Sequence, residues 1–382
     1  MSEPSIRLTK AFVNLHHLTH NMRLLQELVG SRPLWPCIKA DAYGHGAVII
    51  ARHLTSLGYK TFGVADVEEG MALVQAGIQA TFIVLSEALP EHCHALIAHN
   101  FEPTISTLDM AEALAFEAEK AGKRIAVHVK VDTGMGRLGL QPEEVQKFLD
   151  QCGTFPGLHI RGIMSHFPRA DERDKKYSLK QLRRFHQVLE GTQEYKMEVR
   201  HMANSAAIFD LPDAYLDAAR PGIAIYGLHP SREIANPRVN ELKPVLEWKT
   251  RIVFLKEVAA GTGLSYGHAY HTKRRSLIAT VPVGYGDGLS RNLSNHCTML
   301  VHGVRCPQVG RITMDLTLLD VTALRGDVKL GDEVVIIGRQ GAEEVTADEL
   351  AQKLGTINYE VTTCISHRVP RIPSQLEEEK GK

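Results

Sequence analysis

The sequence predicts an α/β protein in which an N-terminal (β/α)8 barrel of the TIM type precedes a mostly β domain. As far as about residue 227, short apolar runs alternate with longer amphipathic stretches, which is typical of successive β/α units. After about residue 235, the runs are rich in β-branched residues and are separated by glycines. We therefore expect a barrel domain over residues 1–235 and a mostly β domain over residues 236–382.

The apolar runs of the first part have the length of buried strands, and their number, eight, is that of the TIM barrel. They cover residues 34–40, 61–65, 81–85, 102–106, 124–132, 159–166, 199–204 and 218–226. Helical patterns lie between them, for example at residues 110–121 and 179–189. In the second part, strands are expected at residues 251–258, 277–283, 304–309, 316–321 and 333–337. A helix should follow Thr346, because Thr346 and Glu349 form a capping box.

The composition favours a small-molecule partner. Lys plus Arg equals Asp plus Glu at 44 each, so no overall charge attracts nucleic acid or an anionic membrane. No run of about 18 apolar residues occurs, and the first residues lack a signal-peptide pattern. The six cysteines show no Cys-x-x-Cys spacing, which argues against a zinc site. We expect a cytoplasmic protein with no bound metal and no nucleic-acid or membrane partner.

Several polar residues end the apolar runs of the first part. Barrel enzymes work at the C-terminal ends of their strands, so these residues should meet at one mouth. They are Lys39, Lys130, Asp132, His166, Asn204 and Ser205, and Arg220 lies within the eighth run. Each alone is common on protein surfaces, but together they predict an active site.

Residues 37–46, Cys-Ile-Lys-Ala-Asp-Ala-Tyr-Gly-His-Gly, resemble the cofactor-lysine motif of alanine racemases. These enzymes use pyridoxal 5'-phosphate, whose aldehyde condenses with a lysine amine that the substrate then displaces. The resemblance implies that Lys39 holds the cofactor and also serves as acid and base on one face of the substrate. It also implies that Tyr43 contacts the cofactor phosphate.

Residues 129–139 resemble the family segment whose arginine contacts the cofactor phenolic oxygen and the substrate carboxylate, which implies that role for Arg137. Lys130 matches a lysine that is often carbamylated in the family and then positions the arginine. An unmodified Lys130 paired with Asp132 is the alternative, and the sequence does not choose between them.

Three further segments of the first part, residues 162–167, 200–206 and 219–227, also resemble family motifs. The resemblance places His166 against the cofactor ring and assigns further cofactor contacts to Asn204, Ser205, Arg220, Gly222 and Ile223. Arg220 should face the pyridine nitrogen. Because an arginine keeps its proton, this nitrogen should stay neutral, which favours return of the proton to Cα over transamination. Arg169 is a departure, since the family usually has small residues there.

Residues 261–267 resemble the family segment that supplies the second base, here Tyr266. Racemisation by two bases needs one group on each face of the substrate. In the family this tyrosine acts from the other subunit and is hydrogen-bonded to the histidine and through it to the arginine. The resemblance therefore implies a chain from Tyr266 through His166 to Arg220, and a homodimer with shared active sites.

Two more segments, residues 282–288 and 310–315, resemble those that line the family's entrance and carboxylate pocket. They imply substrate contact by Met314 and supporting roles for Tyr285 and Asp315, as for Lys130. Gly286 is a mild departure, because the family commonly has alanine there. Tyr359 lies where the family has a phosphate-contacting tyrosine.

The expected activity is interconversion of L- and D-alanine, for peptidoglycan synthesis or alanine catabolism. A racemase of serine or of a basic amino acid is the alternative, because the catalytic residues do not select the side chain. A related barrel decarboxylase would have an acid in place of Arg220, and a non-catalytic carrier of the cofactor would lack the domain with Tyr266.

Overall fold

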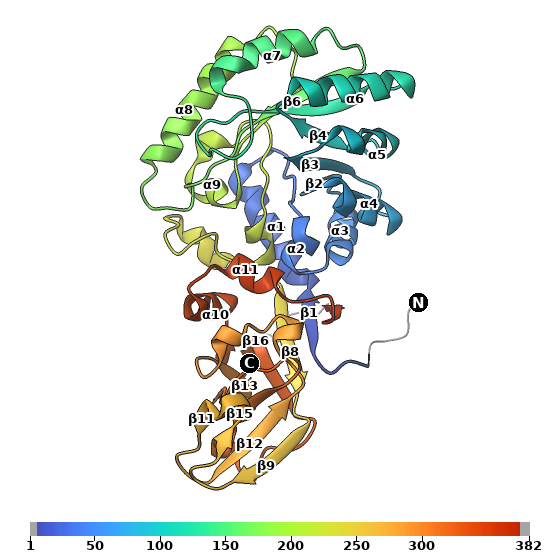
Figure 1. Ribbon diagram of the computed structural model, residues 1–382. Coiled ribbons are helices and arrows are strands. Elements are labelled where there is room, and N and C mark those ends of the chain that lie inside the picture. The colour runs from blue at the N-terminus through green and yellow to red at the C-terminus, as the bar shows by residue number, and fades with distance from the viewer. Residues whose placement is uncertain (1–5, 375–382) are drawn as a thin grey trace. The chain divides into compact units, whose positions relative to one another are not determined.

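The computed structural model describes residues 6–374, which divide into two compact units (Figure 1). The barrel unit comprises Leu18–Ala42 and Ala47–Lys243. The β unit comprises the described residues up to His17, the short segment Tyr43–Gly46, and the described residues from Pro244 onward. None of the helices in residues 6–374 combines the length and apolarity that crossing a membrane requires.

The barrel unit is built on six parallel strands that pair in the order of the sequence. They are β2 (Thr61–Val64), β3 (Thr81–Glu87), β4 (Glu102–Ile105), β5 (Ile125–Lys130), β6 (Leu158–Met164) and β7 (Val199–His201). Two further extended segments connect β7 back to β2, since parallel bridges join His201 to Ala218, Leu34 to Ala219 and Cys37 to Gly63. The predicted TIM-type barrel is therefore confirmed.

Helices follow the strands of the barrel unit, and each turns an apolar face inward. They are α1 (Leu15–Val29), α3 (Ala47–Ser56), α4 (Val67–Gln75), α5 (Cys93–Ala98), α6 (Leu108–Lys120), α7 (Val145–Cys152), α8 (Lys176–Gly191) and α9 (Ser205–Asp210). In α6, Met110, Leu114 and Ala118 are buried at a spacing of one helical turn. The helices α6 and α8 include the predicted helical segments 110–121 and 179–189 almost completely.

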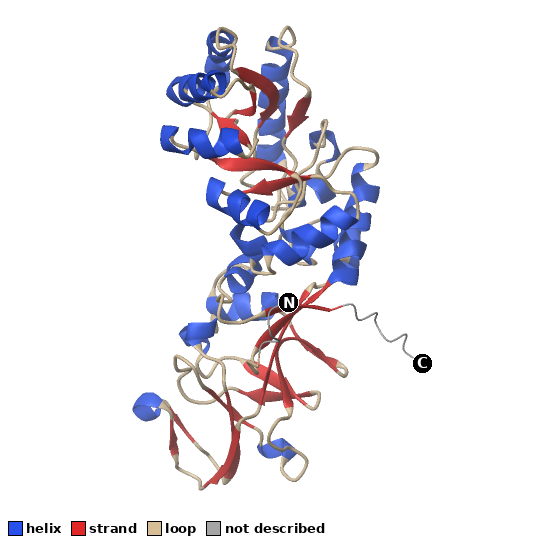
Figure 2. Cartoon of the chain, turned by 90° about the vertical axis from the view of Figure 1, so that its right-hand side faces the viewer, coloured by secondary structure: helices blue, strands red, loops and turns tan. Residues whose placement is uncertain are grey.

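The β unit is mostly strands (Figure 2). Its largest sheet has the order β14-β13-β16-β8-β1-β18, with β17 beside β16. The members are β14 (Val304–Pro307), β13 (Thr298–Val301), β16 (Glu333–Gln340), β8 (Leu246–Arg251), β1 (Lys10–Asn14), β18 (Arg371–Ser374) and β17 (Glu343–Val345). A second sheet, β15-β12-β9, and a short pair, β10-β11, complete the unit. These are β15 (Thr317–Asp320), β12 (Ser276–Val281), β9 (Phe254–Val258), β10 (Gly263–Leu264) and β11 (Tyr270–His271).

Two helices of the β unit, α10 (Ala347–Leu354) and α11 (Asn358–Thr363), lie near the end of the chain. The predicted cap of α10 is present, because the Thr346 hydroxyl accepts a hydrogen bond from the Glu349 amide at 3.0 Å. The predicted strand 251–258 is wrong in one respect: it is divided into the end of β8 and the whole of β9.

The first strand, β1, belongs to this unit and not to the barrel. It pairs antiparallel with β8 and parallel with β18, and alternate side chains, Ala11 and Val13, are buried. Strands from opposite ends of the chain therefore lie side by side in one sheet. The division of the chain at residue 235 stays a proposal.

Candidate active site

Lys39 lies where the first extended segment of the barrel ends. The helix α2 (Lys39–Tyr43) is not an ordinary helix: the φ values of Ala40, Asp41, Ala42 and Tyr43 are 51°, 50°, 55° and 54°. This left-handed conformation costs roughly 1–2 kcal/mol for each residue other than glycine. A run of four such residues persists only where surrounding contacts hold it, so the backbone after Lys39 is tightly determined.

Lys130 lies in a strongly positive environment. Its ammonium group donates to the Leu85 carbonyl oxygen at 3.4 Å. Burial lowers the pKa of Lys130 to about 8, and the charges of Arg220 and Arg137 act in the same direction. A larger fraction of this amine is thus neutral near physiological pH, which is the form that can react with carbon dioxide.

Asp132 does not pair with Lys130 within residues 6–374. Its carboxylate accepts backbone amides of the next loop, from Gly134 and Met135 at 2.8 Å each and from Gly136 at 2.9 Å. The paired alternative for Lys130 is therefore not formed. Asp132 instead shapes the loop that carries Arg137.

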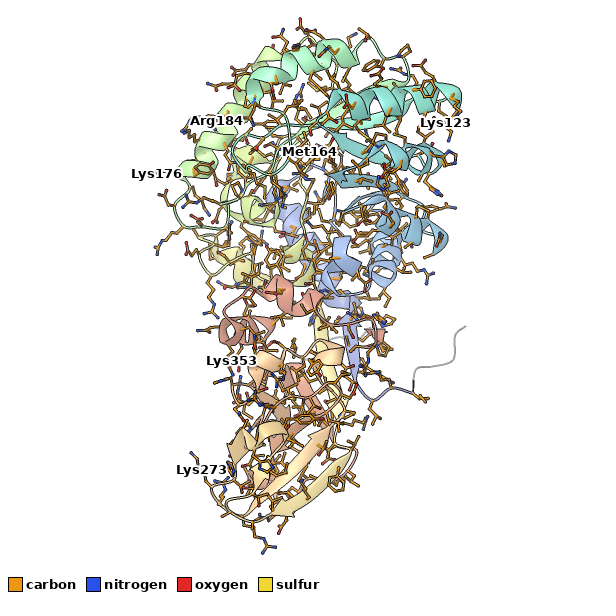
Figure 3. The ribbon with its side chains drawn as sticks, in the orientation of Figure 1. Lys123, Met164, Lys176, Arg184, Lys273 and Lys353 are labelled. Atoms are coloured by element: carbon orange, nitrogen blue, oxygen red, sulfur yellow. The ribbon has the colours of Figure 1, made fainter. Side chains whose placement is uncertain are left out.

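The helix α8 also supports this loop. Arg184, on α8, donates to the Thr133 carbonyl oxygen at 3.2 Å (Figure 3). Gln181, one turn earlier, donates to the carbonyl oxygen of His166 at 3.3 Å. One helix thus contacts the backbone after β5 and after β6.

Arg220 is buried, and both terminal nitrogens of its guanidinium group are hydrogen-bonded to neighbouring groups. One guanidinium nitrogen hydrogen-bonds to Nδ1 of His201, and the other donates to the Ser165 carbonyl oxygen at 2.8 Å. Burial lowers the pKa of Arg220 to about 10, still above neutral pH. No direct hydrogen bond between His166 and Arg220 is present among the described residues, and the histidine that contacts Arg220 is His201.

A chain of buried side chains continues from His201 through the barrel interior. His201 Nε2 lies 2.9 Å from His128 Nδ1, and His128 Nε2 lies 3.0 Å from a Glu102 carboxylate oxygen. Glu102 in turn pairs with Arg161. Because arginine only donates, His201 must accept at Nδ1 and donate at Nε2, and His128 must do the same toward Glu102.

The pKa shifts agree with this order of donors. Burial and then the charge of Arg220 hold the pKa of His201 well below its ordinary value. Burial also lowers the pKa of His128. Burial alone would raise the pKa of Glu102, but the hydrogen bond from His128 and the charge of Arg161 bring it below its ordinary value. Two neutral histidines thus connect a positive arginine to a negative carboxylate. None of His201, His128 and Glu102 was singled out from the sequence.

Backbone amides gather around Ser205. Its hydroxyl oxygen accepts the amides of Gly222 at 2.8 Å and Ala224 at 3.3 Å, at the start of a short 3-10 helix, η4 (Ile223–Tyr226). Asn204 caps α9, since its side-chain oxygen accepts the Ala207 amide at 3.0 Å. Two helix starts with a hydroxyl between them form a cradle suited to a phosphate group. The predicted strand 218–226 therefore ends before η4.

Tyr43 and Tyr359, both predicted to contact the phosphate, lie together in the β unit. Their ring centroids are 6.0 Å apart. The backbone next to Tyr43 packs closely against α11, because a Cβ on Gly44 would overlap the Thr362 carbonyl oxygen.

Tyr266 lies on an exposed and strained loop of the β unit. Its side chain is 72% exposed. Its neighbours Ser265 and His268 have φ values of 60° and 44°, and the Ser265 hydroxyl donates to the Arg311 carbonyl oxygen at 2.7 Å. The phenol makes no hydrogen bond to any residue of the described chain, so it is available to a partner from outside it.

Two loops that carry Tyr285 and Met314 are paired through their backbones. The amide of Tyr285 donates to the Thr313 carbonyl oxygen at 3.0 Å, and that of Gly286 to the Met314 carbonyl oxygen at 2.9 Å. The side chains of Tyr285 and Met314 remain 43% and 52% exposed.

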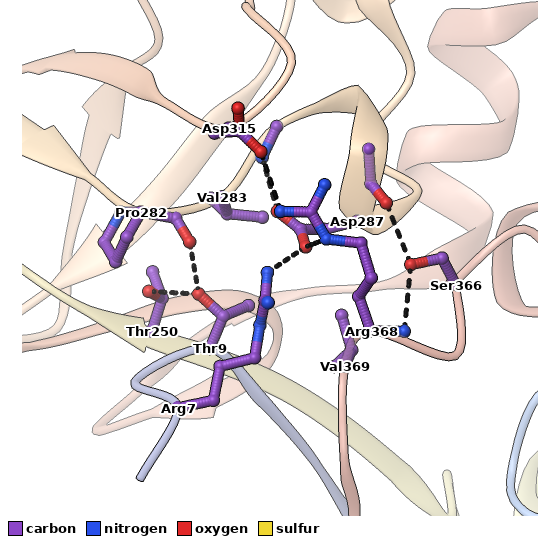
Figure 4. Close-up of polar contacts among 12 residues, drawn as sticks. Arg7, Thr9, Thr250, Pro282, Val283, Asp287, Asp315, Ser366, Arg368 and Val369 are labelled. Carbon is purple, nitrogen blue, oxygen red and sulfur yellow. Dashed lines mark hydrogen bonds and ion pairs between the residues drawn. The ribbon is translucent and has the colours of Figure 1, made fainter.

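An ionic cluster joins Asp315 and Asp287, which follow these two loop residues in the sequence, to Arg368 (Figure 4). Arg368 donates to Asp315 at 2.7 Å and lies 3.5 Å from the buried Asp287, which also pairs with Arg7. A Cβ on Gly286 would overlap the Arg368 guanidinium. The glycine that departs from the family pattern thus makes room for this arginine.

Arg169, the other departure from the family pattern, contacts two neighbouring side chains. Its Nε lies 2.7 Å from both carboxylate oxygens of Glu172, and its guanidinium lies over the Tyr177 ring, 5.7 Å from the centroid. Its charge is therefore already paired, and its side chain is held against α8.

The comparisons with known proteins agree along the whole chain. The family model described as alanine racemase, N-terminal domain, matches residues 13–230, and that described as alanine racemase, C-terminal domain, matches residues 245–373. The chain belongs to the alanine racemase family. An alanine racemase of Halothermothrix orenii is 45% identical over 97% of this chain and 98% of its own length. One of Clostridium novyi is 43% identical over 95% of this chain and 94% of its own length.

Solved structures of the alanine racemase family have the same fold. An alanine racemase of Clostridium difficile 630 superposes with a TM-score of 0.92 at 36% identity, covering 97% of each chain. One of Bacillus anthracis with bound L-Ala-P gives a TM-score of 0.89 at 35% identity, covering 99% of this chain and 97% of that one. As a member of the alanine racemase family, the chain is an isomerase that depends on pyridoxal phosphate.

The residues of the barrel unit fit that cofactor. The cradle at Ser205 brings a hydroxyl group and backbone amides together at two helix starts, which suits a phosphate, and Arg220 presents a fixed, buried guanidinium group that suits a ring nitrogen. Lys39 is the first residue of the strained left-handed segment α2, where a reactive amine can be held in one place.

Proposed function

We propose that this chain interconverts L- and D-alanine with two bases, Lys39 and Tyr266, on opposite faces of the substrate. When bound, pyridoxal phosphate supplies the electron-withdrawing ring that makes the Cα proton of the amino acid acidic. Lys39 removes or returns the proton on one face, and the Tyr266 phenol does so on the other. Arg137 binds the substrate carboxylate, with Met314 beside it.

The main support is the polarity of the chain that ends at Arg220. His201 is neutral and accepts, so the guanidinium keeps its protons and can only donate toward a ring nitrogen. A ring nitrogen that is not protonated withdraws electrons less strongly. Return of the proton to Cα is thereby favoured over transfer elsewhere, as a racemase requires.

Several parts of the proposal concern the assembled enzyme and the cell. We place Tyr266 in a site completed by a second copy of the chain, because its phenol is exposed and unbonded within residues 6–374. Alanine is preferred over serine or a basic amino acid as substrate, since Arg169 is already paired with Glu172. The enzyme would act in the cytoplasm, supplying D-alanine for peptidoglycan or consuming alanine.

The test is to incubate the cofactor-loaded protein with a panel of L-amino acids and to quantify D-enantiomers by chiral chromatography. We expect D-alanine to form at least about tenfold faster than any other product, because a change of one or two heavy atoms in a close-fitting pocket costs about 1–3 kcal/mol. Preferential turnover of serine or of basic amino acids would keep the mechanism and replace the substrate. No product at all would contradict the proposal.

A further inference from the structure

We propose that Glu69 is a positioning residue for Lys39: its carboxylate fixes the strained backbone that directs the lysine side chain. This inference rests on the proposed role of Lys39.

The Glu69 carboxylate bridges the ends of two neighbouring barrel segments. Glu69 lies in the first turn of α4, directly after β2. One oxygen accepts the amide of Ala40 at 2.6 Å, and the other accepts the amide of Ala65 at 2.7 Å. Ala40 follows Lys39, and Ala65 follows the last residue of β2. A single side chain therefore ties the residue after Lys39 to the adjacent strand.

Ordinary helix capping does not explain these contacts. Asp66 is the N-cap of α4, and its side chain accepts the Glu69 amide at 2.9 Å. In a capping box, a glutamate at this position would return to the amide of the N-cap residue itself. Glu69 instead contacts the residue before the cap and a residue 29 positions earlier in the chain. One of its two carboxylate oxygens therefore accepts a hydrogen bond from the loop of Lys39.

The turn after Lys39 needs such a contact. Ala40 is the first of its four left-handed residues. Other hydrogen bonds hold later parts of the segment: the Ala42 amide donates to the Ile38 carbonyl oxygen at 2.8 Å, and the Asp41 carboxylate accepts the Ala47 amide at 2.7 Å. Among residues 6–374, Glu69 is the group that accepts the Ala40 amide, the one next to Lys39. Hydrogen bonds to an ionised carboxylate are the stronger kind, which suits this task.

The experiment compares Glu69→Gln with Glu68→Gln. Glutamine has the same size but offers one acceptor oxygen and one donor group, so it can accept only one of the two amides. Glu68 is the neighbouring residue on α4 and is exposed, so its variant makes the same charge change without touching the loop. Burial raises the pKa of Glu69, so the measurements are made at about pH 8, where it is ionised.

The first readout does not use activity. Cofactor-free protein is mixed with pyridoxal phosphate, samples are reduced with borohydride over time, and the labelled lysine is identified by peptide mass. We expect Glu69→Gln to label Lys39 about tenfold or more slowly than the wild type, because a small misplacement of a reacting group can cost as much as about 100-fold. Glu68→Gln should match the wild type.

The second readout is steady-state racemisation of alanine. We expect kcat of Glu69→Gln to fall about 10- to 100-fold while KM changes less than about threefold, since Lys39 reacts whereas other residues bind the carboxylate. The melting temperature is recorded for each variant. If Glu69→Gln does not fold, Glu69→Asp replaces it, with both oxygens retained on a shorter side chain and the same expected slowing of labelling.

Unchanged labelling of Lys39 in Glu69→Gln would overturn the inference and leave the proposed function standing. An equally slow labelling of Lys39 in Glu68→Gln would also overturn the inference, because the loss of one negative charge on α4 would then explain the result in both variants. If the wild type were labelled at a lysine other than Lys39, the proposed function would fail, and this inference with it.

Discussion

At the scale of single residues, the clearest feature is that a permanent charge is buried against neutral partners. Arg220 is 4% exposed, and His201 and His128 are fully buried. Leaving such a charge unpaired would be very costly, but the sequence of donors and acceptors ends on the ionised Glu102. The barrel interior thus keeps Arg220 charged and oriented, at the expense of burying two titratable rings in their neutral form.

This arrangement predicts how stability depends on pH. Because the pKa of His201 is lowered in the folded protein, the unfolded chain binds more protons below the ordinary histidine value of about 6.5. Stability should therefore be retained above about pH 6.5 and fall as pH decreases below it, by about 1.4 kcal/mol per pH unit for each such histidine. His201→Asn should reduce that slope by about one proton, measured as the free energy of unfolding in urea between about pH 5 and 6.5.

The matched control is His94→Asn, because His94 is an exposed histidine of the same unit. Its variant should keep the slope of the wild type. A slope that is the same in His201→Asn and the wild type would mean that His201 is not held neutral in the folded protein.

At the scale of elements, loops are shaped by carboxylates that accept backbone amides. Asp132 organises the loop after β5, and Glu87 accepts the amide and hydroxyl of Ser106 after β4, at 3.1 and 2.7 Å. Such contacts tie loop geometry to the ends of rigid strands. The side chains that these loops carry are therefore positioned before any ligand arrives.

Asp132→Ala tests this for the loop of Arg137. Removing the carboxylate leaves three amides without their acceptor, so the loop should become mobile and the arginine less well placed. We expect KM for alanine to rise about tenfold, with a smaller change in kcat, in steady-state assays. Asp109→Ala, at an exposed position in the same unit, should leave both constants within about twofold. An unchanged KM in Asp132→Ala would show that the loop holds its shape without this residue.

The elements were largely predictable from the sequence, but several contacts that build the site were not. Apolar runs located β2 to β6 within a few residues, and the Lys39 motif pointed to the first strand end. The left-handed turn at Ala40 could not be inferred, because alanine disfavours that conformation and only tertiary contacts hold it. The link from His201 to His128 joins residues 73 positions apart, and no local pattern records such a pairing. The same is true of β1, whose partners lie near the other end of the chain.

At the scale of the whole molecule, the proposed groups are divided between two units of one chain. Lys39, Arg137 and Arg220 belong to the barrel unit, whereas Tyr43, Tyr266 and Met314 belong to the β unit. Each unit is internally complete, with its own core and its own ionic contacts. Neither unit contains both of the proposed bases, so the proposed mechanism depends on whether the two bases of one site come from one copy of the chain or from two.

Complementation between two inactive variants decides whether one site draws on two copies. Lys39→Ala and Tyr266→Phe should each be inactive as homodimers, the first for lack of the cofactor lysine and the second for lack of one base. If Tyr266 acts on the partner's substrate, a hybrid dimer contains one site with both bases intact and one with neither. Random mixing of equal amounts should then restore about one quarter of wild-type activity, measured as D-alanine formation after co-expression. Hybrid dimers that are demonstrated by differential tagging and yet remain inactive would mean that both bases of a site come from the same chain.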